Sequence, residues 1–167
     1  MATKVKFSLP RSVWTAKDSA RLANDTLASI KLRTSKGIDA NGEDFDEYSQ
    51  EPIYVSKRGA RLKPKGGQPS RTGKSIYYEG GYQQYKHDSR RRAKLAGSAD
   101  VDLVLSGNMM NNLVVKKATK SGFSIGLTDK AGYGYYVNID REFLGLSEDD
   151  VDILIEAVSI ELRKKLT

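Results

Sequence analysis

The stretch VDLVLSGNMMNNLVV, residues 101–115, decides the fold that the sequence predicts, because an alternating apolar run stops inside it and then resumes. Within 101–105, apolar side chains recur at every second position, which is the period of a half-buried β-strand. Ser106 can cap a short helix that continues through Met110, and strand character returns at Leu113. The stretch predicts a strand, one helical turn and a second strand, although a bulged hairpin would show the same pattern. The structural motif at this break consists of Ser106, Gly107 and Met109.

The strand pattern continues after this break. Alternating apolar residues occupy Leu113–Lys117, Phe123–Leu127 and Tyr133–Val137, and a turn at Ser121–Gly122 separates the first two segments. Successive short strands joined by turns form an antiparallel meander. We therefore expect a β-meander of three strands over residues 113–137.

An amphipathic helix is predicted on each side of the meander. Thr15 with Asp18 begins the first helix, which extends to about Ile30, and Ser147 with Asp150 begins the second. The apolar stripes are Ala16, Ala20, Ala23, Leu27 and Ile30 in the first helix, and Val151, Leu154, Ile155, Val158, Leu162 and Leu166 in the second. The predicted fold class is α+β: an antiparallel β-meander flanked by an N-terminal and a C-terminal amphipathic helix, with a long basic arm or hairpin.

The arm is the segment 56–75. The 167 residues, 38% of them hydrophobic, can form one modest core, so a single domain over 1–167 is expected. Glycines, prolines and basic residues leave the arm almost no apolar side chains for that core. We predict that the arm is ordered from outside: if the chain is a subunit of an assembly, the positive charges of the arm can meet acidic surface on an adjacent copy or on the layer above it. Its candidate interface residues are Lys57, Arg58, Arg61, Lys63, Lys65, Arg71 and Lys74.

The positive charge of the chain is concentrated in one window. Residues 57–94 contain twelve Lys or Arg but only Glu79 and Asp88, which makes the window +10, whereas the rest of the chain is −3. Such a window suits phosphate groups or an acidic protein partner. Two alternatives stay open: a nucleic-acid-binding module that uses residues 57–94, and a charged surface that is simply solvated. The candidate contacts beyond the arm are Lys86, Arg90, Arg91 and Arg92.

Several kinds of site are not expected. The chain has no Cys and one His, which leaves no disulfide, no thiolate metal site and no multi-histidine centre. The acidic loop 36–47 lacks the spacing of a calcium-binding loop, and the Gly-Lys-Ser at 73–75 lacks the first glycine of a phosphate-binding loop. No general base can be named for Ser106, so Ser106 is not predicted to be a nucleophile. No catalytic residue, cofactor or metal is predicted for the chain. No apolar run reaches the length of a membrane span, and no export signal is visible.

Three phrases of the sequence resemble a known family. They are RTSKGIDANGEDFDEYS at 33–49, GYQQYK followed by VDLVLSGNMMNNL within 81–113, and IDREFLGLSEDD at 139–150. In this order they resemble the tail-completion or neck proteins of tailed bacteriophages, also called the virion-morphogenesis group. The last phrase adds Arg141, Phe143 and Leu144 to the structural motif residues.

The resemblance implies a structural protein of the virion and no enzyme. Family members form a homo-oligomeric ring, expected to be hexameric, which acts as a tail terminator or completion ring between the head connector and the tail tube. The implied partners are other copies of the chain, head connector or stopper proteins and the tail tube protein, with a passing contact to packaged DNA. The implied location is the neck or tail of the virion, after synthesis in the cytoplasm of the bacterial host, with no membrane contact.

Overall fold

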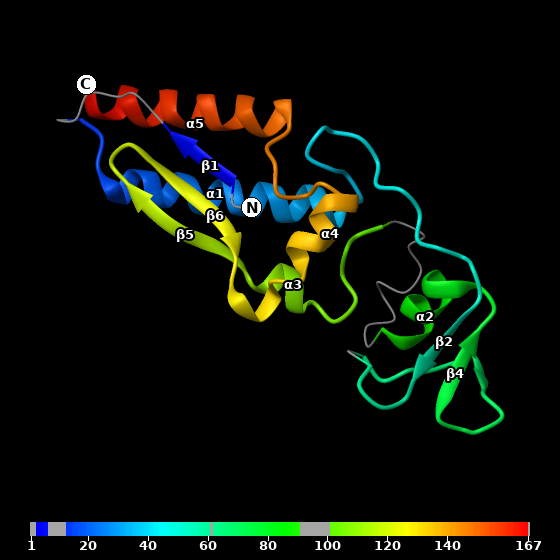
Figure 1. Cartoon of the computed structure of the whole chain (residues 1–167). Coiled ribbons are helices and arrows are strands. Elements are labelled where there is room, and N and C mark those ends of the chain that lie inside the picture. Colours follow the sequence, from blue (N-terminus) through cyan, green and yellow to red (C-terminus); the bar gives the residue numbers. More distant parts are fainter. Residues whose placement is uncertain (1–2, 7–12, 61, 91–100, 167) are drawn as a thin grey trace. The chain divides into compact units, whose positions relative to one another are not determined.

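The computed structural model describes residues 3–6, 13–60, 62–90 and 101–166. The chain forms two compact units (Figure 1): unit 1 comprises Met1–Phe45 and Asn108–Thr167, and unit 2 comprises Asp46–Gly107. Each unit buries apolar residues of its own, so the single core expected from the composition is divided between them. The prediction of one domain over 1–167 stays a prediction.

Unit 1 is built on a three-stranded antiparallel sheet. Its strands are β1 (Thr3–Lys6), β5 (Leu113–Thr119) and β6 (Gly122–Leu127), in the order β1-β6-β5. β5 and β6 form the predicted hairpin, and β1 pairs with the other side of β6 so that Thr3 lies opposite Ile125. Helix α1 (Ala16–Ser35) lies behind β5 and β6 in Figure 1 and covers one face of the sheet.

The two long helices of unit 1 run antiparallel to each other. Salt bridges between α1 and α5 (Glu148–Leu166) join Arg21 to Glu161 and Asp18 to Lys165. The capping box of Thr15 and Asp18 is present, but α1 continues past Ile30 to Ser35. The predicted stripe of α1 is partly wrong: Ala16 is exposed, whereas Ala23 and Ile30 are fully buried. The other buried residues of this helix are Ser19, Leu22, Thr26, Arg33 and Thr34.

The prediction of a third meander strand is wrong. Tyr133–Val137 lies mostly within helix α4 (Gly134–Asp140), which follows the short helix η2 (Asp129–Ala131). A Cβ on Gly134 would lie 2.5 Å from Leu127 and 3.0 Å from Met109, so a glycine is needed where this helix approaches the core. In the sheet, β1 occupies the position beside β6 that the third meander strand was predicted to take. The four residues of β1 form too short a pattern to be detected in the sequence.

Unit 2 contains a second antiparallel sheet and one helix. Its elements are β2 (Ile53–Ser56), β3 (Gln68–Pro69), β4 (Ser75–Tyr78) and α2 (Gly81–Ser89), and the strand order is β2-β4-β3. Ile76, Tyr78 and Tyr85 form its core, where the two tyrosine rings lie 5.4 Å apart. β2 and β4 pair antiparallel, and α2 places Tyr85 in the core.

The predicted strand at 101–105 does not form. The backbone is irregular there, and Leu103 adopts a positive φ of 51°, a conformation that residues other than glycine rarely adopt. Side-chain contacts of Asp102 hold this segment in place of a strand ladder. The following helix α3 (Asn108–Asn111) is present, but it begins one residue later than a cap at Ser106 requires.

The fold class itself is confirmed: helices and antiparallel sheets combine in an α+β fold that has an N-terminal and a C-terminal helix. Both predicted cap pairs are present, since the amide of Asp150 donates to the Ser147 hydroxyl at 3.2 Å. The caps were predictable because they depend on residues three positions apart.

Candidate interaction sites

The segment 56–75 is not a free arm, because side chains of unit 2 bind its backbone. The hydroxyl of Tyr78 donates to the carbonyl of Lys65 at 2.6 Å, and that of Tyr85 donates to the carbonyl of Leu62 at 2.8 Å. The amide of Lys65 donates to Ser89 at 3.1 Å. Contacts inside unit 2 thus hold the backbone of the segment, and its ordering by an outside partner stays a prediction.

The cations of this segment nevertheless face solvent. The exposed candidates are Lys57, Arg58, Lys63, Lys65, Arg71 and Lys74. Arg61 lies outside the described residues, as do Arg91 and Arg92. An interface role for the described six stays a prediction.

Lys86 and Arg90 are used inside unit 2. The Lys86 ammonium lies 2.6 Å from Asp102 and 2.6 Å from the Tyr48 hydroxyl, and only 5% of its side chain is exposed. The Arg90 guanidinium pairs with the same carboxylate and donates to the carbonyl of Val104 at 2.9 Å. The structure therefore brings both cations to one buried anion, which leaves them little capacity for phosphate or an acidic partner.

Asp102 is ionised at neutral pH in this cluster. Burial acts to raise the pKa of Asp102, but the hydrogen bonds from Arg90 and Lys86 outweigh it and hold the pKa below its ordinary value. The amide of Val104 also donates to this carboxylate. The cluster binds the segment around 102–104 to α2, which is a structural task.

A second buried cluster joins the last turns of α1 to the start of α5 in unit 1. Arg33 pairs with Asp150 and donates to the carbonyls of Phe143 and Gly145 at 3.0 and 3.1 Å. Phe143 is fully buried and Leu144 is 7% exposed, and both of their amides donate to Asn138. Arg141 is half-buried close to them in the sequence. Phe143 and Leu144 of the last phrase thus lie in the buried connection between α1 and the segment that enters α5.

The three motif residues at the predicted break differ in their exposure and backbone conformation. Ser106 is exposed, Gly107 has a φ of 81°, and Met109 is 5% exposed against Gly134. The positive φ explains the glycine, because other residues rarely adopt it. The prediction that Ser106 is not a nucleophile stays a prediction.

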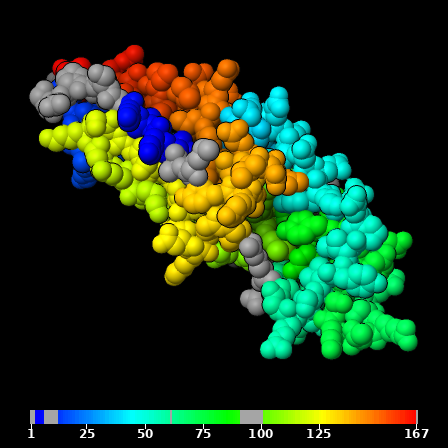
Figure 2. Space-filling model, viewed as in Figure 1, coloured from blue at the N-terminus to red at the C-terminus, as the bar shows by residue number. Residues whose placement is uncertain are grey.

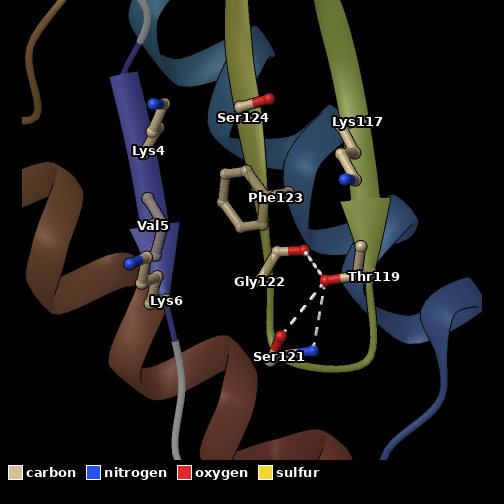
Figure 3. Close-up of a pocket in the computed structure, with 9 residues that line it drawn as sticks. All are labelled: Lys4, Val5, Lys6, Lys117, Thr119, Ser121, Gly122, Phe123 and Ser124. Atoms are coloured by element: carbon tan, nitrogen blue, oxygen red, sulfur yellow. Dashed lines mark hydrogen bonds between the residues drawn. The ribbon is translucent and has the colours of Figure 1, made fainter.

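A hollow of about 610 Å³ lies on the sheet of unit 1 (Figure 3). We call it the lysine hollow; its lining residues are Lys4, Val5, Lys6, Lys117, Thr119, Ser121, Gly122, Phe123 and Ser124. Ser124 of β6 lies between Lys4 of β1 and Lys117 of β5 in the sheet register. Figure 2 shows β1, in blue, at the molecular surface between α5 and the yellow β5–β6 hairpin.

The lysines of this hollow carry no salt bridge to a carboxylate within the part of the chain that the structure describes. Sequence reasoning missed them, because it searched for one continuous basic window. The detectable signal was a local absence of acid: residues 3–6 and 113–127 contain lysines but no Asp or Glu.

Helix α5 exposes much of its predicted apolar stripe. Ile155 is 58% and Leu166 is 72% exposed, and Leu154 is its buried apolar residue. The further exposed apolar residues of α5 are Val151, Ile153 and Ile160. Large apolar side chains gathered on one helix are typical of a surface that another chain covers.

Over 3–6, 13–60, 62–90 and 101–166, no group of three acidic, His or Cys side chains is arranged to hold a metal ion. Across these same ranges, every helix is too short or too polar to cross a bilayer. Compared with protein-family models, with curated proteins and with solved structures, the chain matches none.

Proposed function

We propose that the chain is a structural protein of the neck of a tailed-phage virion, where copies form a ring that joins the head connector to the tail tube. In this proposal the protein performs no catalysis, and its partners are other copies, the connector or stopper proteins and the tail tube protein. A hexameric ring and a location in the virion neck belong to the same proposal, because both follow from the resemblance.

One observation carries the proposal: residues from the three family-like phrases contact one another. In unit 1, Arg33 of the first phrase binds Asp150 of the last phrase, and the amide of Ala40 donates to the carbonyl of Glu142 at 2.7 Å. In unit 2, Tyr48 of the first phrase and Asp102 of the second both bind Lys86. The phrases therefore contain positions that hold each unit together, and this supports the proposal that the chain shares the fold of the family.

The exposed apolar face of α5 supplies a surface for assembly. Subunit interfaces cover apolar patches that a monomer would leave in water. Ile155 and Leu166 are accessible to such a neighbour in unit 1. The alternative of a nucleic-acid module over 57–94 is less well supported, since Lys86 and Arg90 are already paired with Asp102.

The proposal is tested in the phage that encodes the chain. A stop codon early in the gene is expected to yield separate filled heads and finished tails in electron micrographs of the lysate, and expression of the chain from a plasmid is expected to restore joined particles. Joined particles without any of the protein would overturn the proposal.

A matched pair of variants tests the assembly surface. Ile155→Arg changes α5 and Leu32→Arg changes α1, and both wild-type side chains are 58% exposed. Both variants should therefore fold, but Ile155→Arg is expected to fail in complementation while Leu32→Arg succeeds. Equal success of the two would remove α5 as the assembly surface.

A further inference from the structure

We propose that the lysine hollow binds the phosphate backbone of a double-stranded nucleic acid without reading its base sequence. Lys4, Lys6 and Lys117 supply the positive charge, and the hydroxyl of Ser124 supplies a neutral donor. This site is separate in sequence from the basic window 57–94. The inference does not rest on the ring proposal, because it concerns the isolated chain.

The charges of the hollow call for an anion. Lys4 and Lys117 lie on the two strands that flank β6, and neighbouring strands are about 5 Å apart. Lys6 lies two residues along β1, about 7 Å from Lys4. Like charges at these separations, without carboxylate partners among the described residues, create a positive potential that attracts anions.

The floor of the hollow allows a close approach. In the sheet register, Lys6 lies opposite Gly122 and Lys4 lies opposite Ser124, so β6 presents small residues between the lysines. The Thr119 hydroxyl donates to the carbonyl of Gly122 at 3.1 Å and lies 3.3 Å from the hydroxyl of Ser121. Figure 3 marks both interactions. Lysines with serine and threonine hydroxyls are typical contacts of phosphate oxygens.

The lysine hollow suits the phosphate backbone of a nucleic acid and not its bases. Phe123, the one aromatic residue among those that line it, is only 4% exposed, so its ring offers no face on which a base could stack. Single strands are usually held by such stacking, whereas duplexes are held through their phosphates. The lysines are also spread across two strands, which fits repeated phosphates better than one small anion.

The hollow also differs from a protein-docking surface. Protein interfaces have an apolar or aromatic centre. Among the described residues of unit 1, the large apolar side chains that are exposed belong to the helices, for example Tyr136, Ile139 and Ile155, and none comes from β1, β5 or β6. An acidic protein is therefore the less favoured partner, and the experiment distinguishes it.

Fluorescence anisotropy of a labelled duplex of arbitrary sequence tests the site in the full chain. The wild-type affinity is expected to fall steeply between about 50 and 200 mM salt, with a slope of about −0.9 per neutralised phosphate. The triple variant Lys4→Gln, Lys6→Gln, Lys117→Gln should bind at least about tenfold more weakly, with a slope that is shallower by about 2–3.

The matched control removes the same charge from the helical side of unit 1. Lys17→Gln, Lys36→Gln, Lys164→Gln changes three exposed lysines and should keep the wild-type slope. Equal losses in both triples would mean that only net charge matters, and the proposed site would be wrong. Absence of wild-type binding would also overturn it.

A single substitution tests the geometry. Ser124→Glu places a carboxylate between Lys4 and Lys117, where opposite charges across strands are favourable, so the variant should fold. It should weaken duplex binding severalfold more than Ala28→Glu on the exposed side of α1, which changes the net charge equally. Equal effects would contradict the site.

Two measurements on the wild-type protein complete the test. Acetylation mapped by mass spectrometry should show that duplex protects Lys4, Lys6 and Lys117 but not Lys17 or Lys36. Polyglutamate at equal charge concentration should displace the duplex poorly. Protection of the control lysines alone, or displacement by polyglutamate as effective as by unlabelled duplex, would reject a phosphate site in favour of a different surface or an acidic protein partner.

Discussion

Arg33 of α1 and Asp150 of α5 form a buried ion pair, although 117 residues separate them in the chain. Asp150 also accepts from Ser29 and from the amide of Ser147, so one carboxylate ties both long helices to the segment that enters α5. Burial lowers the pKa of Arg33, and the charge of Asp150 opposes this shift. A guanidinium stays protonated in proteins, so Arg33 keeps its positive charge despite its burial.

Arg33→Met should destabilise unit 1 strongly. It leaves Asp150 buried without its cation, which typically costs about 3–5 kcal/mol of unfolding free energy. The control is Arg21→Met on the same helix, whose side chain is 61% exposed in its pair with Glu161 and should change stability by about 1 kcal/mol or less. Urea denaturation measures both, and similar small losses would show that the Arg33 pair is not a determinant of stability.

Stability of unit 2 should fall in acid because of Asp102. Its folded-state pKa is lowered, so its contribution is fully present above the unfolded value of about 4 and is lost as the pH falls through the folded value. Asp102→Asn should lower the melting temperature at neutral pH and flatten the acid dependence. Calorimetry from about pH 6 to 2 measures this, with exposed Asp152→Asn as the control. A wild-type profile and an Asp102→Asn profile that run parallel would contradict the prediction.

Gly81→Ala should disrupt unit 2 far more than Gly59→Ala. Both glycines have positive φ, 65° and 84°, and so share a conformational penalty of about 1–2 kcal/mol. A Cβ on Gly81 would lie 2.6 Å from backbone atoms of Ser49, Gln50 and Glu51, whereas a Cβ on Gly59 meets open space. Thermal unfolding should therefore separate the two variants, and equal losses would mean that the backbone at 49–51 can move away freely.

Tyr78→Phe combined with Tyr85→Phe should loosen the segment 56–75. The change removes two hydroxyls that bind its carbonyls, each worth about 1 kcal/mol. Trypsin cleavage after Lys65 and amide exchange in the segment should both accelerate. Tyr54→Phe is the control, because that residue is 68% exposed in the same unit. Unchanged cleavage in the double variant would show that other contacts order the segment.

The sequence predicted what depends on near neighbours in the chain. The caps at Thr15 and Ser147 and the hairpin of β5 and β6 follow from spacings of a few residues. Alternation was misleading at 133–137, because Gly134 permits a helix to pack closely on Leu127 and Met109. It was also misleading at 101–105, where the contacts of Asp102 determine the backbone.

The candidate surfaces were less predictable than the helices. Lys86 and Arg90 are basic in sequence, but their charge is compensated by an aspartate that only the fold brings near. Conversely, Lys4 and Lys117 belong to distant segments, and pairing of β1 and β5 with the same strand brings them into one hollow. No local pattern contains either arrangement.

The position of β1 in the sheet has a consequence for the order of folding. A ribosome makes Thr3 long before it makes Ile125, the residue opposite it in the finished sheet. The β5–β6 hairpin can close locally within microseconds. In contrast, the pairing of β1 with β6 closes a loop of more than a hundred residues, which is a slow and entropically costly step. Pulse-labelled amide exchange during refolding should therefore protect the β5-facing amides of β6 before the amides of Thr3–Lys6.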